Sequence, residues 1–270
     1  MRIPSWCRCF FRTADLFRRD KRRRRPLRRK SVWLAVELLE SRLTPATYIP
    51  TTFSDLAITG LSDVNASGQI ASQGNAITLR SAIIANNKAG GGNTISLGTG
   101  TYQLSIAPVM SGTSGSGSFH KSAYNNGTGF ALNGSLDVTN ALTITGAGKG
   151  QTIIDGGNLD VIFSINPFIV STNNSANTAG FAASLSNLTL QHGNNPSDDG
   201  VNGFSAGGAI WWEGGWLNGV SQNSGSLSLD HVTVDHNTTH GGGGGLVVYN
   251  GGTVSITSST FSNNTVTGER

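Results

Sequence analysis

The chain has 270 residues, 37 of them glycine, and only 13% are charged. Both cysteines, Cys7 and Cys9, lie near the N-terminus, so the rest of the chain can form no disulfide and no thiolate metal site. No run of about 18 apolar residues occurs, and a transmembrane helix is therefore not predicted.

Charge divides the chain into two parts. Residues 1–45 hold 14 Lys and Arg against 4 Asp and Glu, whereas residues 46–270 hold 5 against 11. The net charges are thus +10 and −6, which together give the +4 of the whole chain. The basic balance belongs to the first part, and the rest lacks the positive surface that nucleic-acid binding requires.

Residues 1–46 are predicted to form a basic leader, largely disordered, with one short amphipathic helix. Ten of the thirteen residues 18–30 are cationic. The helix is indicated by one apolar stripe that ends at Pro45 and consists of Val32, Val36, Leu39 and Leu43. An export leader, a nuclear-localisation or nucleic-acid arm, and a solvated tail all fit this composition. Glu37 and Glu40 interrupt the apolar part that an export leader needs.

The segment Glu37 to Ala46 (ELLESRLTPA) decides which of these interpretations we favour. It resembles the LE-x-LE-x-R-x-x-P-type N-terminal motif of planctomycete surface and secreted proteins. The resemblance implies export, with the protein extracellular or at the outer membrane and cell surface.

Residues 47–270 form the predicted folded body, which opens with one helix. Thr78 is a suitable N-cap, and Gly90 to Gly92 end the helix. The next segment, residues 93–106, alternates as strands do. A short amphipathic helix ahead of a repeat array is expected to cover the open end of its first coil.

Three later segments line up residue for residue: 183–194, 227–238 and 254–265. Each alternates apolar and polar residues on both sides of a two-residue bend, which predicts two short strands meeting at a corner. Repetition of this unit predicts stacked coils with a shared interior. The residues expected to point inward are Ala183, Leu185, Leu188, Leu190, Leu227, Leu229, Val232, Val234, Val254, Ile256, Ser259 and Phe261.

Spacing gives a first estimate of the stack. Residues 136–144 read as a fourth, imperfect copy, and residues 110–129 as a Gly/Ser-rich loop. Val138 and Leu185 lie 47 positions apart, Leu185 and Leu229 lie 44 apart, and Leu229 and Ile256 lie 27 apart. With roughly 20–27 residues per coil, the two longer gaps should hold two coils each, and about eight to ten coils should fit in all.

Corner asparagines should also repeat along such a stack. Asn237 and Asn264 occupy equivalent positions in the second and third segments. Inward Asn side chains can bond from coil to coil and satisfy backbone groups at the corners.

Short motifs carry a second resemblance. The segments 207–210 (GGAI), 244–247 (GGLV) and 261–264 (FSNN) resemble the paired GG-[AL]-[IVY] and F-x-x-N motifs of the chlamydial-type polymorphic outer-membrane protein repeat, and 234–237 (VDHN) is a degenerate match. Residues 78–87 (TLRSAIIANN) resemble the CSLREA-type segment that opens many bacterial right-handed β-helix surface proteins. There Ile77 stands at the Cys position, and Ser81 replaces the Arg- or Glu-like polar residue.

The resemblance implies an all-β body, a right-handed single-stranded parallel β-helix with a short N-terminal capping helix. Such proteins lie at the cell surface or are secreted and are often adhesive, which implies surface glycans or other cell-surface proteins as partners. No cofactor is implied. Because the chain stops just after a repeat with no polar cap, we expect it to be truncated at its C-terminus.

A carbohydrate-active β-helix, a polysaccharide lyase or hydrolase, is the alternative function. A lyase-like site needs clustered carboxylates and a cationic base, but the only cation after Lys149 is Arg270. Asp198 and Asp199 form a carboxylate pair in an Asn/Pro/Gly loop, which alone is weak evidence for hydrolysis. We therefore predict no catalytic residues, and a non-enzymatic protein is the favoured interpretation.

Two further groups are candidate binding residues. His192 and His236 are equivalent, with His231 and His240 nearby, but the 44-residue spacing predicts an intervening coil and a separation of about 9–10 Å, so no metal site is predicted. The candidate ligand-binding residues are Trp211, Trp212 and Trp216. Their indoles either stack on sugar rings or a partner surface, or pack an insertion onto the wall of the body, which is the favoured interpretation.

Overall fold

The structure is a computed structural model that describes residues 44–108, 131–166, 180–195, 207–214, 216–217, 220–221, 224–249 and 251–268. Residues 44–270 form one compact unit. The leader helix and the 110–129 loop predicted from the sequence lie outside the described residues.

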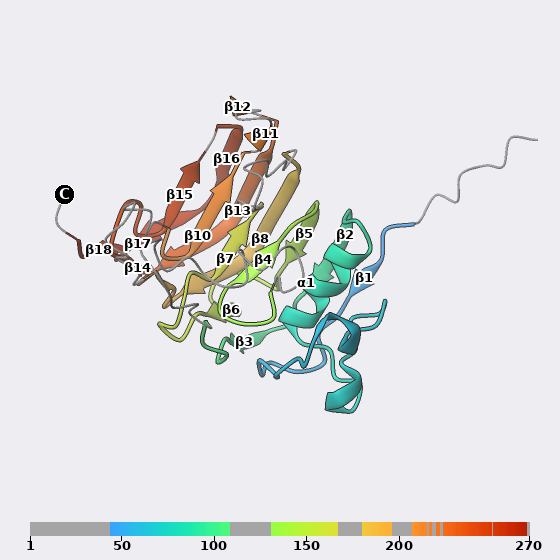
Figure 1. The fold of residues 1–270 in the computed structure, drawn as a ribbon. Coiled ribbons are helices and arrows are strands. Elements are labelled where there is room, and N and C mark those ends of the chain that lie inside the picture. The colour runs from blue at the N-terminus through green and yellow to red at the C-terminus, as the bar shows by residue number, and fades with distance from the viewer. Residues whose placement is uncertain are drawn as a thin grey trace, which may run out of the picture. The chain divides into compact units, whose positions relative to one another are not determined.

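The described body is mostly β, and its three larger sheets are parallel (Figure 1). The helical elements are η1 (Leu61–Asp63), η2 (Ala71–Gln73) and α1 (Leu79–Lys88). The main sheet has the order β1-β2-β5-β8-β13-β16, with β3, β6 and β17 beside it. Its strands are β1 (Thr47–Tyr48), β2 (Asn93–Ser96), β3 (Gly100–Gln103), β5 (Leu142–Thr145), β6 (Thr152–Asp155), β8 (Ala182–Gln191), β13 (Ser226–Asp235), β16 (Thr253–Thr257) and β17 (Thr260–Ser262).

The other described strands form two smaller parallel sheets and one antiparallel pair. The four-stranded sheet has the order β15-β10-β7-β4, and the three-stranded sheet has the order β18-β14-β9. Strands β11 and β12 pair antiparallel. The bounds are β4 (Leu136–Val138), β7 (Phe163–Ile165), β9 (Asn194–Asn195), β10 (Ile210–Glu213), β11 (Trp216–Leu217), β12 (Val220–Ser221), β14 (Thr238–Thr239), β15 (Leu246–Tyr249) and β18 (Thr265–Val266).

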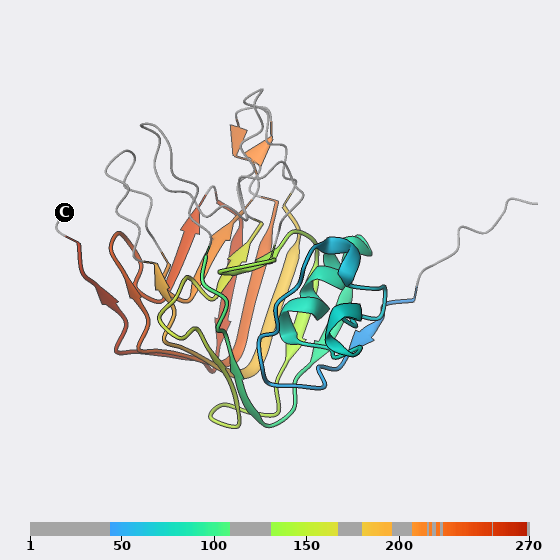
Figure 2. The same ribbon diagram turned by 60° about the horizontal axis from the view of Figure 1, so that its bottom comes forward.

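Strands that neighbour one another in the main sheet carry equivalent residues side by side. Leu185 of β8 pairs with Leu229 of β13, and Leu229 pairs with Ile256 of β16. All of these pairings are parallel, and a parallel pair needs a connection that leaves the first strand before the second begins. In Figure 2 the strands accordingly follow one another in chain order, from green to red.

Each long strand of the main sheet bends once, at a residue with left-handed backbone geometry. Asn187 in β8 has φ 56°, and His231 at the paired position in β13 has φ 54°. A second left-handed residue ends each strand, His192 after β8 and His236 after β13, with φ 54° and 51°. Asn and His tolerate this conformation better than branched residues do, which explains why polar residues occupy the corners.

The inward residues predicted for the first two segments are confirmed. All eight are buried, and each is at most 5% exposed. The third segment differs, because Ile256 is 48% and Phe261 39% exposed. Their strands β16 and β17 pair only with β13 among the described strands, so one side of their apolar row is uncovered.

The predicted spacing of the repeats is wrong. Strand β8 pairs directly with β13, so the 44 positions between Leu185 and Leu229 contain no intervening strand of the main sheet. The partner of Leu185 on β5 is Ile144, and not Val138, which lies in the four-stranded sheet. The path of the main sheet holds six described strands, fewer than the eight to ten coils that the spacing suggested.

The expected asparagine pairing along the stack is confirmed. The Asn237 side chain donates to Asn264 Oδ1 at 3.0 Å and to the Leu190 carbonyl at 3.2 Å, and it accepts from the Gly193 amide at 2.8 Å. Asn264 donates in turn to the Val234 carbonyl at 2.9 Å. Asn237 is fully buried, and its amide therefore satisfies backbone groups that water cannot reach.

Helix α1 begins where the sequence predicts. Thr78 accepts from the Ser81 amide at 3.0 Å, and the Ser81 hydroxyl accepts from the Thr78 amide at 2.9 Å, which completes a capping box. The helix packs against β2 and β4. Asn87 contributes through its side chain, which donates to the Asp137 carbonyl of β4 at 2.8 Å.

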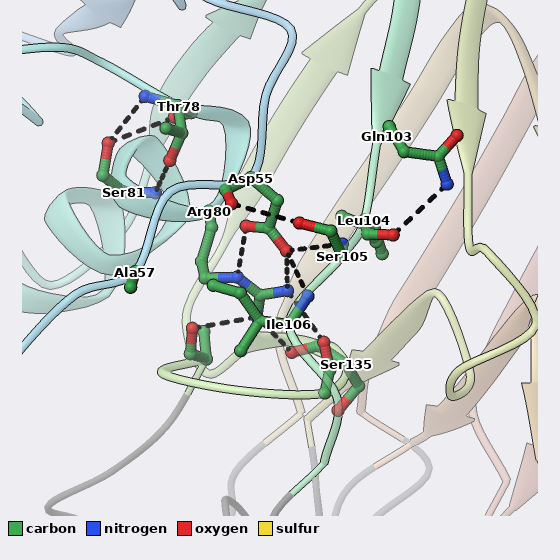
Figure 3. Close-up of polar contacts among 12 residues, drawn as sticks. Asp55, Ala57, Thr78, Arg80, Ser81, Gln103, Leu104, Ser105, Ile106 and Ser135 are labelled. Atoms are coloured by element: carbon green, nitrogen blue, oxygen red, sulfur yellow. Dashed lines mark hydrogen bonds and ion pairs between the residues drawn. The ribbon is translucent and has the colours of Figure 1, made fainter.

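A buried ion pair connects the start of α1 to one segment that precedes the helix in the chain and to another that follows it (Figure 3). Arg80 is fully buried, and its guanidinium binds both carboxylate oxygens of Asp55 at 2.7 and 2.8 Å. Its remaining hydrogen bonds go to the carbonyls of Ala131, Gly134 and Ser135, at 2.9 to 3.1 Å. All of the donors of the guanidinium are thus used within the protein.

Candidate functional site

Each long strand of the main sheet has two corners: the bend at its first left-handed residue and the end at its second. A row of polar side chains crosses the main sheet just before the second corner. In register, Gln103 of β3 pairs with Asp155 of β6, Asp155 with Gln191 of β8, Gln191 with Asp235 of β13, and Asp235 with Ser262 of β17. We call these five residues the corner row. Because side chains at one register position share a face of the sheet, the row places two carboxylates on one face.

Asp155 is held by several donors from neighbouring strands. Gln191 donates to Oδ2 and the Gly157 amide to Oδ1, both at 2.9 Å, and Gln103 donates to Oδ1 at 3.3 Å. The Nδ1 atom of His192 lies 2.9 Å from Oδ2. Burial alone would raise the pKa of Asp155, but the bonds from Gln191, Gly157 and His192 outweigh it, so the pKa is lowered.

Asp235 has a similar set of partners one strand further. Ser262 donates to Oδ1 at 2.7 Å and Asn263 at 2.9 Å, and His236 Nδ1 lies 2.6 Å from Oδ2. The hydrogen bond from Ser262 is the main cause that lowers the pKa of Asp235 to about 2, and bonds from His236 and Asn263 add to it. Both carboxylates are therefore ionised at neutral pH.

The two histidines of this corner lie together, and the predicted separation is wrong. The ring centroids of His192 and His236 are 6.3 Å apart, because β8 and β13 are direct neighbours. Both rings are accessible, with 42% and 58% of the side chain exposed. We call His192 and His236 the corner histidines.

Each corner histidine is oriented by a carboxylate at Nδ1. In the neutral ring, an Nδ1–H that donates to Asp leaves the lone pair on Nε2. Neither Nε2 has a hydrogen-bond partner within the described residues. The arrangement can therefore accept a proton, bind a metal ion or accept a hydrogen bond from a ligand.

His231 repeats the same pairing at the other corner. Its Nδ1 lies 2.9 Å from Asp230 Oδ1. Its neighbours at the equivalent corner positions are Asn187 of β8 and Ser258 after β16, and not a second imidazole. The described residues contain no group of three or more His, Cys, Asp or Glu arranged to hold a metal ion.

The sequence comparison missed Asp155, although a signal was present. Residues 152–157 (TIIDGG) align with 188–193 (LTLQHG) and 232–237 (VTVDHN), and this alignment places Asp155, Gln191 and Asp235 at one position. The three aligned segments, 183–194, 227–238 and 254–265, do not include the short strand before Gly156. The adjacent carboxylates Asp198 and Asp199 lie outside the described residues.

The three tryptophans proposed to bind a ligand have different environments. Trp212 is fully buried in the core, where its ring lies against Gly225 and Gly252, so it cannot stack on a sugar; for this residue the packing interpretation applies. Trp211 points to the other side of β10 and is partly buried, and its indole N–H has no partner among the described residues. Trp216 begins β11, and its side chain lies outside the description.

Two other charged groups lie away from the corner row. The Asp55–Arg80 pair is closed to ligands, because its side chains are 2% and 0% exposed and the guanidinium donors are all used. Lys149, the last cation before Arg270, donates to the Ser258 carbonyl at 2.9 Å, at the first corner and not at the corner row.

Comparison of the chain with protein-family models, with curated proteins and with solved structures gave no match. Among the described residues, no helix is long and apolar enough to cross a membrane. The interpretation of function therefore depends on the geometry and on the motifs in the sequence.

Proposed function

We propose that residues 47–270 are successive coils of a right-handed parallel β-helix that acts as a non-enzymatic adhesive or structural protein outside the cell. The observation that carries the proposal is the repeated register, in which Ile144, Leu185 and Leu229 stack in one buried row. Equivalent residues that stack in this way let each repeat cover the apolar face of the next.

The outward side of the same strands supports a display role. Positions that alternate with the buried row hold short polar residues, such as Thr143, Ser184 and Ser228, which pair in register. A regular polar face of this kind, on a parallel sheet with many backbone bonds, is suited to presenting loops to solvent. The resemblance of residues 37–46 to an export motif supports the extracellular location that this function requires.

The adhesive role makes surface glycans or cell-surface proteins the partners, with Trp211 and Trp216 as the remaining aromatic candidates. The test is binding of the purified full chain to immobilised glycans and to whole cells, alongside antibody labelling of intact source cells. We expect surface labelling, and weaker binding by W216A than by the parent chain. A cytoplasmic location would contradict the proposal, and unchanged binding by W211A and W216A would exclude the aromatic platform.

A carbohydrate-active enzyme is the second candidate, because Asp155, Asp235 and the corner histidines gather at one corner. The two carboxylates are two strands apart, which corresponds to roughly 9–10 Å between their backbones. Both have lowered pKa values, so neither is suited to the role of general acid that hydrolysis needs.

Turnover assays separate the two functions. The chain is incubated with neutral and uronic-acid polysaccharides, and reducing ends and unsaturated products are measured for the parent and for D235N. The adhesive proposal predicts no product above a heat-inactivated control. Product formation that D235N abolishes would replace it with the enzymatic function.

A further inference from the structure

We propose that His192 and His236 form a binding site for one divalent transition-metal ion, of the class of Zn²⁺, Ni²⁺ or Cu²⁺, with Asp155 and Asp235 as positioning residues. The site goes beyond the proposed function. It requires only that β8 and β13 are neighbours, and it holds whether or not the body is adhesive.

The distance between the rings fits one shared ion. A metal lies about 2.0–2.1 Å from an imidazole nitrogen, so the ring centroids of two histidines that share it are roughly 5 to 6.5 Å apart for bond angles between tetrahedral and linear. The observed centroid distance is 6.3 Å, at the linear end of this range, so tetrahedral binding requires the rings to move about 1 Å closer together. Both side chains are substantially exposed, and small rotations can therefore complete the geometry.

The second contact of each ring matches the usual surroundings of a metal-binding histidine. Such a histidine binds the metal through one nitrogen and donates from the other to a carboxylate, which fixes the tautomer and the ring orientation. Here Nδ1 of His192 is 2.9 Å from Asp155, and Nδ1 of His236 is 2.6 Å from Asp235. Two rings are thus oriented independently, by carboxylates from two different strands.

The ligand set determines the class of ion. Imidazole favours Zn²⁺, Ni²⁺ and Cu²⁺, whereas Ca²⁺ and Mg²⁺ prefer oxygen ligands. Asp155 and Asp235 use their oxygens for hydrogen bonds within the protein, to Gln191 and Ser262 among others. With two protein ligands, the other positions of the ion are left to water or to a donor from a partner.

The chain contains its own control. His231 has the same left-handed backbone and the same Asp contact, at 2.9 Å from Asp230, but its neighbours Asn187 and Ser258 supply no second imidazole. A single histidine of this kind should bind the ion much more weakly than the pair.

The test uses Asn in place of each histidine, because Asn already occupies the left-handed corner positions at residues 187 and 263. H192N, H236N, the double variant and H231N are made in the full chain, with C7S and C9S in every protein to remove thiolate binding. Zn²⁺ binding is measured by calorimetry, and the nitrogen ligands of bound Cu²⁺ by electron paramagnetic resonance. Melting without metal verifies that the variants fold.

We expect one site that H192N and H236N each abolish, with no further loss in the double variant and less than about a twofold change in H231N. D155N and D235N should lower the affinity roughly 10–100-fold, since they weaken the orienting bond. An equal loss in H231N, additive losses in the double variant, or a parent chain that binds no better than the double variant would each overturn the proposal.

Discussion

At the scale of single residues, backbone conformation decides which side chains occupy the corners. The second corner carries His192, His236 and Asn263 in successive strands, all with φ between 51° and 54°. Small or polar residues tolerate the left-handed region, whereas branched apolar residues are strained there. The histidines are thus compatible with the bend, and their side chains are directed to the outside of the sheet, where Asp155 and Asp235 receive them.

Removal of the buried guanidinium should be costly. R80A leaves Asp55 charged, 2% exposed and without its main partner. Loss of one member of a buried ion pair costs roughly 3–5 kcal/mol, and we expect the free energy of unfolding to fall by that amount. R80K keeps the charge but loses the two-pronged contact, and it should lie between parent and R80A in urea denaturation. Equal midpoints for parent and R80A would refute the role of this pair.

At the scale of elements, glycine allows the connections between the sheets to stack closely. A Cβ added to Gly193 would lie 2.0 Å from the Gly208 carbonyl, and one added to Gly208 would lie 2.3 Å from the Gly244 carbonyl. These backbones are too close for a side chain. Gly193 and Gly208 are in contact within the connection between β8 and β13, and Gly208 and Gly244 bring this connection against the one that follows β13.

G208A should therefore be destabilising and G242A should not. The added methyl at Gly208 meets backbone atoms of Gly244 and Thr238 at less than 3 Å, whereas a Cβ at Gly242 meets nothing within 4 Å. Overpacking of this kind costs roughly 1–3 kcal/mol, and more where backbone must move. Thermal melting of the two variants beside the parent measures the difference. A similar decrease in the melting temperature of both would mean that the clash is not the cause.

Acid should weaken the short turns before α1. Asp63 of η1 accepts from the side chain and the amide of Ser72, and these bonds lower its pKa to about 2. A lowered folded-state pKa stabilises the protein above the ordinary Asp value of about 3.9, and this stabilisation is lost as the pH falls towards 2. D63N should thus be less stable than the parent at pH 7, and the difference should shrink by pH 2. A difference independent of pH would contradict this.

The alternation of apolar and polar residues made the core strands predictable, whereas the run of glycines left the register of another strand pair unpredictable. Leu185, Leu188 and Leu229 could be assigned to the core because alternation is a local property of a strand. The register of the glycine motif could not be predicted, because five glycines occupy residues 241–245. The structure pairs Ile210 with Leu246, one position away from the partner that the motif alignment gives. Alternation also separates Trp211 from the buried Trp212, but the sequence does not show which of the two faces the interior.

At the scale of the whole molecule, the varying length of the connections prevents the sequence from showing which strands are neighbours at the site. The sequence shows 44 positions between Leu185 and Leu229 and 27 between Leu229 and Ile256, yet each pair is in direct register. A long connection and an additional coil add residues in the same way, and no local pattern distinguishes them. Only the strand pairing in the structure therefore shows that His192 and His236 are neighbours.

Equivalent positions in different strands contribute unequally to stability, because they are buried to different extents. Leu229 is fully buried between two strands, whereas Ile256, its partner in register, is 48% exposed. L229D should lower the free energy of unfolding by at least about 4 kcal/mol, through lost burial and a buried carboxylate. I256D should cost about 1 kcal/mol or less. Circular dichroism melting compares the two, and equal effects would contradict the assignment of the interior.

The left-handed corners have a consequence for how such a protein can change over time. Because a corner side chain contributes little to the interior, substitution there can alter the chemistry of the surface while the folding free energy stays nearly constant. Adjacent strands hold these positions about 4.8 Å apart. Exchange of His, Asn and Ser at successive corners would therefore allow natural variants to gain or lose a pair of neighbouring functional groups by a single codon change.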